Sequence, residues 1–329
     1  MREVVFIRRN QERWHSYEHQ PAATPEELAA RFVALTDDLA YARTFYPSSP
    51  VTLHLNQLAS RFHEQLHRRP APKRRGFGYF WLTELPLLVA RHWKALATSL
   101  ALFLIFAGLG ALSAAEDDTF VRLILSDEYV NMTLENIRRG RPTDVYGTAP
   151  EVEMFLFIAY NNVRVALTTF ALGATAGLGT LYLLFRNAVM VGSFQYFFIQ
   201  QGVGLQASLA IWLHGTIEIS CIVLAAGAGL VLGSSLLFPG SYPRGEALRR
   251  SAQDAMKLMA GLVPLIVLAA FLEGFVTRLA PQHPISISLP VIALSLVLIV
   301  GYFVVYPWWL HRRAQRSGFE LPHADAEAP

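Results

Sequence analysis

The sequence has a single cysteine, Cys221, and little charge. One cysteine cannot form an intrachain disulfide or a cysteine-based metal site. Only 16% of the 329 residues are charged and the formal net charge is +3, so the composition gives no support for nucleic-acid binding. Between Asn187 and Tyr242, Glu218 is the only formally charged residue. So long a stretch without other charges excludes an ordinary soluble enzyme.

Signatures of catalysis are also lacking in the apolar parts of the chain. No apolar run contains the H-E-x-x-H or G-x-S-x-G pattern, and no glycine-rich loop resembles a phosphate-binding motif. We therefore expect no enzyme activity, no catalytic residue and no cofactor. The first long apolar run starts near residue 93, so an N-terminal signal peptide is not expected.

What the chain has instead is long apolar runs, in a composition that is 53% hydrophobic. Runs of 18 or more residues with almost no charge predict membrane-spanning helices. We expect an all-α, polytopic membrane helix bundle with about six spans, at roughly 94–115, 157–185, 188–204, 207–237, 257–279 and 286–307. The third span is short, and the sequence leaves open whether it crosses the membrane or is re-entrant.

Charge placement divides the chain into regions with respect to the membrane. Basic residues gather before the first span, between the fourth and fifth spans, and after the last span, whereas 116–155 is rich in acidic residues. The positive-inside rule then places the N and C termini in the cytoplasm of a multi-pass cell inner-membrane protein. The predicted regions are a cytoplasmic helical head (1–75), an interfacial segment (76–93), a transmembrane domain (94–310) with an outer amphipathic helical segment (116–155), and a disordered cytoplasmic tail (311–329).

Glycine recurs at short intervals within the apolar runs. Small residues in this spacing let helix backbones approach closely inside a membrane, where the hydrophobic effect does not drive helix association. Tight packing is one interpretation, and a pore or sliding surface lined by glycine is the other. The candidate packing glycines are Gly173, Gly177, Gly179, Gly192, Gly215, Gly227 and Gly229.

His214 and Glu218 are separated by four residues, so both side chains lie on one face of a helix at membrane depth. Charged groups at this depth are costly and are usually paired. By depth, polar residues of the second and fifth spans should fall in the same outer half of the membrane. The predicted buried polar cluster comprises Asn161, Asn162, Arg164, Asn187, His214, Glu218 and Glu273.

Three roles for this cluster remain open. It is a structural polar contact between helices, a transport or proton-coupled site, or a catalytic or metal site. One histidine and one glutamate supply too few ligands for zinc, so no metal site is expected from this pair.

Five polar and small-residue motifs follow one another in the second half of the chain. They are Tyr160-Asn161-Asn162, Gly173-x-x-x-Gly177-x-Gly179, Arg186-Asn187-Ala188-x-x-x-Gly192, His214-Gly215-x-x-Glu218 and Ala226-Gly227-Ala228-Gly229-Leu230. This succession, over about residues 90–310, resembles the stage II sporulation protein M family of membrane proteins. Residues 1–75 look like the cytoplasmic extension of its non-sporulating members.

The resemblance implies an inner-membrane scaffold or assembly protein related to cell-envelope or membrane remodelling. Its implied partners are the lipid bilayer, other membrane or envelope proteins, and a MoxR-type AAA ATPase. The polar cluster favours an alternative, a channel or transporter with a buried His/Glu site. The glycine faces permit a homo-oligomer without requiring one.

Overall fold

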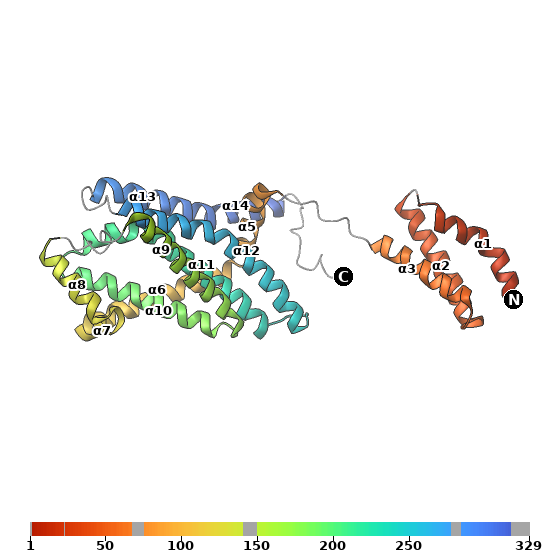
Figure 1. Cartoon of the computed structure of the whole chain (residues 1–329), viewed down its shortest axis with the longest axis horizontal. Helices are drawn as coiled ribbons and strands as arrows, with labels where there is room; N and C mark the ends of the chain where they lie inside the picture. Colours follow the sequence, from red (N-terminus) through yellow and green to blue (C-terminus); the bar gives the residue numbers. More distant parts are fainter. Residues whose placement is uncertain (1, 23, 68–75, 141–149, 278–283, 317–329) are drawn as a thin grey trace. The chain divides into compact units, whose positions relative to one another are not determined.

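The computed structural model describes residues 2–22, 24–67, 76–140, 150–277 and 284–316 of the chain. Its regular elements are helices, in agreement with the all-α prediction. The chain divides into two compact units, Met1–Arg75 and Gly76–Pro329. Figure 1 shows the helices of both units.

The N-terminal unit consists of three helices, α1 (Glu3–His19), α2 (Pro25–Phe45) and α3 (Pro50–His67). Helix α2 begins with Thr24, whose hydroxyl accepts a hydrogen bond from Glu27 N at 3.2 Å and so caps the first turn. The unit has an apolar core of its own, in which the buried Trp14 lies with Leu35 and Leu55. The three helices of the head therefore form a core among themselves.

The second unit is a bundle of long helices that run side by side (Figure 1). Its principal members are α6 (Trp93–Glu116), α9 (Glu151–Ala171), α10 (Leu178–Gln200), α11 (Gly204–Leu237), α12 (Arg244–Phe271) and α13 (Pro284–Val300). Within the part of the chain that the structure describes, five segments are long and apolar enough to cross a membrane: Trp93–Glu116, Glu151–Ala174, Gly204–Leu237, Arg244–Val276 and Ile285–Arg313. Helix α10 has 23 residues and a length of roughly 34 Å, similar to these spans. Helix α10 is not among the five segments because its polar residues lower its mean hydropathy.

The turn between the second and third predicted spans was placed wrongly. The sequence predicts a second span to residue 185, but α9 ends at Ala171 and is followed by a 3-10 turn, η3 (Leu172–Ala174). The chain reverses there, with φ values of 54° at Ala176 and 85° at Gly177. The left-handed region suits glycine, which lacks a Cβ. Helix α10 then starts at Leu178, and Asn187 lies inside this helix instead of in a loop.

Helix α11 is the central helix of the bundle. In its most apolar window 67% of the residues are buried, compared with 17% for the span that contains α13. One face of α11 carries Ile217, Cys221 and Ala225, which pack in a core with α12 residues such as Leu262 and Ile266. The polar residues His214 and Glu218 lie beside this apolar row on the same helix.

One end of the bundle carries two short helices, α7 (Asp118–Leu125) and α8 (Asp127–Arg138) (Figure 1). The sequence predicts a single helix near 119–139, but Ser126, with φ 76°, interrupts it. Asp117 caps α7, and hydrogen bonds from Thr119 hold the pKa of the Asp117 carboxyl below its usual value. We call this the α7–α8 end.

The opposite end carries α5 (Leu85–Arg91), which follows α4 (Phe77–Tyr79) and the π-helix η1 (Phe80–Glu84). The last helix, α14 (Tyr306–Arg316), lies beside them after the π-helix η6 (Gly301–Val305). Tyr302 donates a hydrogen bond to Trp81 O at 2.6 Å. Of the tail predicted to be disordered, 311–316 are helical because they continue α14, and 317–329 lie outside the described residues.

Candidate functional site

His214 and Glu218 lie on α11, one turn apart. Counted from Gly204 at the α7–α8 end, His214 is about 15 Å along the helix axis and Glu218 is about 21 Å along it. The hydrocarbon core of a bilayer is about 30 Å thick, so both residues fall deep within the bundle. The His214 side chain is 6% exposed.

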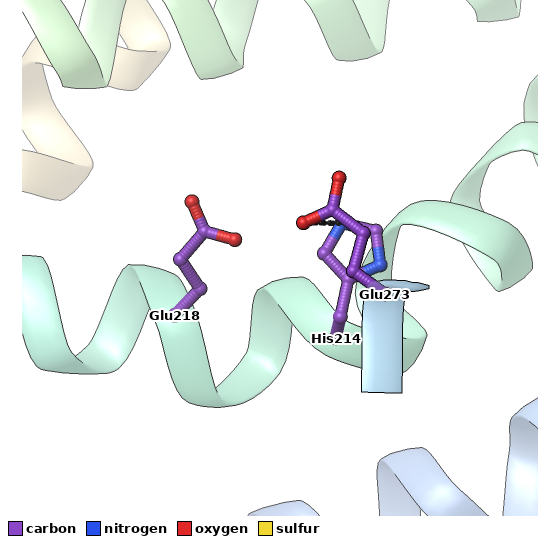
Figure 2. A group of neighbouring side chains, drawn as sticks. All are labelled: His214, Glu218 and Glu273. Carbon is purple, nitrogen blue, oxygen red and sulfur yellow. Dashed lines mark ion pairs between the residues drawn. The ribbon is translucent and has the colours of Figure 1, made fainter. Parts of the chain in front are cut away.

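The third member of the group comes from another helix. Glu273 lies in a π-helical turn, η4 (Leu272–Val276), which ends α12. One carboxylate oxygen of Glu273 lies 3.8 Å from His214 Nε2. Figure 2 shows the Glu218 carboxylate one turn along α11 and pointing toward the other two groups. One ligand atom from each of the three residues lies within 4.8 Å of the others.

Thr277 fixes the orientation of the His214 ring. Its hydroxyl donates a hydrogen bond to Leu272 O at 3.2 Å and lies 3.2 Å from His214 Nδ1. The Thr277 oxygen can accept the proton of Nδ1 while its own proton goes to Leu272 O, or the hydroxyl can donate to Nδ1. Nε2 is therefore the ring nitrogen that faces Glu273.

Side-chain amides complete the polar group. Asn162 of α9 is buried and, like Glu218, lines the cavity described below. The Asn161 amide donates to Asn162 Oδ1 at 3.2 Å. Asn187 of α10 donates to Leu183 O at 2.8 Å within its own helix. The residues that line the site thus come from three neighbouring helices as well as α12.

A cavity of about 490 Å³ connects these residues. Its walls are formed by residues of α6 to α11 and of η4, from Leu125 and Tyr129 near the α7–α8 end to Glu218 and Ile222 inside the bundle. His214, Glu273, Asn161, Asn162 and Asn187 all contribute to the lining. The polar cluster is therefore one wall of a pocket that is open at its surface and is not sealed between packed helices.

Arg164 does not join the cluster. Its side chain is exposed and is not among the residues that line the cavity. Successive residues of an α-helix are rotated by about 100°, so Arg164 points nearly opposite to Asn162. The other six predicted members, Asn161, Asn162, Asn187, His214, Glu218 and Glu273, line the same cavity.

The candidate packing glycines fall into three groups. At Gly173, Gly192, Gly227 and Gly229 an added Cβ would meet atoms of another segment at 2.2, 1.9, 2.5 and 2.4 Å, so close helix contact requires glycine there. Gly177 and Gly179 lie at the α9–α10 turn and the start of α10, and the backbone of Gly177 also packs closely on Gly233 of α11, where a Cβ would meet Gly177 N at 2.5 Å. A Cβ at Gly215 would make only ordinary contacts, the nearest at 3.6 Å, and this glycine lines the cavity.

Several residues of the site were not found from the sequence. Thr277 gives no signal of its own, because threonine is common in membrane helices. Gln195 does give one, since its amide inside α10 is unusual. It donates to Ser208 Oγ at 2.6 Å and accepts from Trp212 Nε1 at 3.2 Å beside the cavity. Glu273 as a third potential ligand also changes the argument against a metal site, which considered only His214 and Glu218.

A short histidine motif outside the bundle was also missed. His63-Glu64-Gln65-Leu66-His67, in α3 of the head, has H-E-x-x-H spacing. In metalloproteases this pattern needs a third ligand and a cleft. His63 and Glu64 are exposed, and no described histidine, cysteine or carboxylate joins them in a group that would hold a metal ion. The motif supports no catalytic assignment.

The fold and the site define a class, that of polytopic, all-helical membrane proteins with a pocket in the bundle to which several polar side chains contribute. The family model of stage II sporulation protein M matches residues 99–278, more than half of the chain. The protein belongs to this family. The model of a domain of unknown function (DUF8413) matches residues 4–68, the helical head. No curated protein and no solved structure matches the chain.

Proposed function

We propose that the protein is a channel or transporter whose membrane unit binds a small cation or polar solute at His214, Glu218 and Glu273. The observation that supports this is the cavity of about 490 Å³ that reaches all three side chains. A polar group that only joins helices would be packed on every side, because empty volume forfeits dispersion contacts. An interior space with a few convergent polar groups is the usual form of a small-ligand site.

The orientation in the membrane forms part of the proposal. We propose a cell inner-membrane location with both termini in the cytoplasm, because the basic clusters flank the α5 end of the bundle. The α7–α8 end then faces outward, and the cavity lies in the outer half. Glu128→Cys, in α8, and Gln253→Cys, in α12, test this in a Cys221→Ala background. An impermeant thiol reagent added outside should label only Glu128→Cys, and the reverse pattern would contradict the orientation.

Water access to the cavity is the critical test. Ile219 lines the cavity, whereas Ile217, two residues earlier, is 1% exposed and lies in the apolar core. In full-length protein with Cys221→Ala, Ile219→Cys should react with a small charged thiol reagent and Ile217→Cys should not. Equal lack of reaction at both positions would show a dry interior, and the proposal would fail.

A second function, that of an assembly scaffold, is supported by a different observation. The head is a separate unit with its own core and matches a family model of its own. In this proposal the head recruits partners, such as other envelope proteins or an AAA ATPase of the MoxR type, and no enzyme activity resides in the chain. Glu218→Gln distinguishes the two functions. A scaffold carrying this change keeps its partners in a pull-down, whereas a channel or transporter keeps its fold and loses flux.

A further inference from the structure

We propose that His214, Glu218 and Glu273 form a binding site for a divalent transition-metal cation, with Zn²⁺ as the best-fitting probe. The proposal rests on the proposed function in one respect, because the cation reaches the site through the same cavity. The ligands are His214 Nε2 and one carboxylate oxygen from each glutamate. Figure 2 shows the three groups turned toward a common centre.

The geometry is close to what a zinc ion requires. With bonds of about 2.0–2.2 Å in a tetrahedral arrangement, two ligand atoms are separated by roughly 3.4 Å. His214 Nε2 and the Glu273 oxygen are 3.8 Å apart, and the most distant pair in the group is within 4.8 Å. A small rotation about the side-chain torsions of Glu218 would close the remaining gap.

The hydrogen bond from the histidine is the second observation. Metal-binding histidines usually donate one ring N–H to a nearby oxygen, which fixes the ring and directs the lone pair of the other nitrogen at the metal. Thr277 can provide this oxygen for Nδ1 while its own proton goes to Leu272 O. In that tautomer the Nε2 lone pair faces Glu273, 3.8 Å away, as a metal ligand would.

The charges of the two glutamates also favour a divalent cation at this site. As metal ligands the two glutamates would be ionised and carry a charge of −2 inside the bundle, and neither lysine nor arginine is among the described residues that line the cavity. A divalent cation neutralises this charge, whereas a protonated His214 would neutralise only half of it. Buried charges without such compensation are strongly unfavourable.

The donor set selects the kind of metal. One imidazole nitrogen with two carboxylate oxygens suits Zn²⁺, Mn²⁺ or Fe²⁺, and it lacks the sulfur ligands that Cu⁺ prefers. Mg²⁺ and Ca²⁺ prefer oxygen alone. With three protein ligands, a fourth position faces the cavity and is open to water or to a solute. The site thus has the ligand number of a reactive or transporting metal site and not that of a closed structural one.

Direct binding is the test, with full-length protein purified in detergent and stripped with a chelator. The head has exposed histidines at four-residue spacing, so the background should carry His15→Ala, His19→Ala and His63→Ala to remove surface binding. In this background we expect one Zn²⁺ per chain by calorimetry and by elemental analysis. Absorption-edge spectroscopy should show one nitrogen and at least two oxygens at about 2.0–2.2 Å.

Ligand variants and a matched control decide the assignment. His214→Ala, Glu218→Gln and Glu273→Gln should each lower Zn²⁺ affinity by more than about 100-fold, which exceeds the typical effect of a supporting residue. Met190 lines the same cavity with an apolar side chain, and Met190→Ala should leave the affinity unchanged. Helix content and elution volume confirm that each variant is folded. Unchanged binding in Glu218→Gln and Glu273→Gln would overturn the proposal.

Thr277 is a positioning residue, and its variants provide an independent check. Thr277→Val removes the oxygen that accepts from Nδ1 and should weaken Zn²⁺ binding by about 10- to 100-fold, while Thr277→Ser should restore it. Equal affinities in the two variants would contradict the orientation argument. If Ile219→Cys reacts with the charged reagent but no Zn²⁺ binds, the metal proposal fails alone. If neither occurs, the proposed function fails as well.

Discussion

The contact between α6 and α10 predicts a large effect of adding one methyl group at Gly192. A Cβ there would lie 1.9 Å from Ala107 O and 2.8 Å from Ala107 C. Both are backbone atoms and cannot rotate away, so reaching even 3.0 Å requires the helices to separate by about 1.1 Å. The reciprocal contact at Gly110, whose Cβ would meet Val189 O at 2.4 Å, would be lost with it.

Overpacking of this kind typically lowers the free energy of unfolding by about 1–3 kcal/mol, and the better helix propensity of alanine offsets up to about 1 kcal/mol of this loss. We expect Gly192→Ala to lower the free energy of unfolding by about 2 kcal/mol, because rigid backbone places it at the upper end of the range. Gly108→Ala, on the same α6 with nothing within 4 Å of the added Cβ, is the matched control and should be neutral or stabilising. Titration with SDS in mixed micelles, followed by circular dichroism, measures both. Equal stability of the two variants would refute the close-contact argument.

Three further predictions concern a turn, the head and the α7–α8 end. Gly177→Ala, at φ 85°, should cost about 1–2 kcal/mol in the same SDS titration, and a neutral result would contradict the left-handed turn. The buried Trp14 Nε1 donates to Asp38 Oδ2 at 2.8 Å, so Asp38→Ala should leave it without an acceptor and cost about 1–3 kcal/mol. The rate of hydrogen exchange in α1, measured in the full chain, should rise in Asp38→Ala and should rise less in Asp38→Asn. Burial raises the pKa of Tyr129 to about 12 from 10.0, so the unfolded state loses this proton first and stability should fall between pH 10 and 12. Tyr129→Phe should show a shallower fall, and parallel pH profiles would count against the burial of the phenol.

The helices of the bundle could be predicted from the sequence because long apolar runs free of charge are typical of membrane-spanning helices and of few other structures. The α9–α10 turn was misplaced because 165–185 contains no charged residue and thus resembles one continuous span. The turn depends on positive φ values at Ala176 and Gly177, and glycine in a membrane helix is also compatible with close packing. Composition alone cannot separate these two uses of glycine.

The polar residues of the site were identifiable because each is out of place in an apolar run. Their mutual arrangement could not be predicted, since depth in the membrane does not determine which way a side chain faces. Arg164 and Asn162 illustrate the difference: they lie at nearly the same depth, yet only Asn162 lines the cavity. The helical phase of α9 relative to α11 is set by packing at Gly173 and Gly229, whose backbones meet. No local pattern near Arg164 carries that information.

The π-helical turn at Glu273 lies where the end of α12 contributes to the site. A π turn makes i→i+5 hydrogen bonds and inserts one extra residue, which rotates every later side chain relative to a regular helix. Thr277 follows this turn and donates to Leu272 O, five residues back, while its oxygen lies at His214 Nδ1. Residues four apart also share a face in a regular α-helix, so the π turn changes the angle between Glu273 and Thr277 but is not needed to bring them to one side. Such turns cost helix stability and are frequent at functional sites. The irregular turn beside the cluster is therefore consistent with a role that goes beyond joining helices.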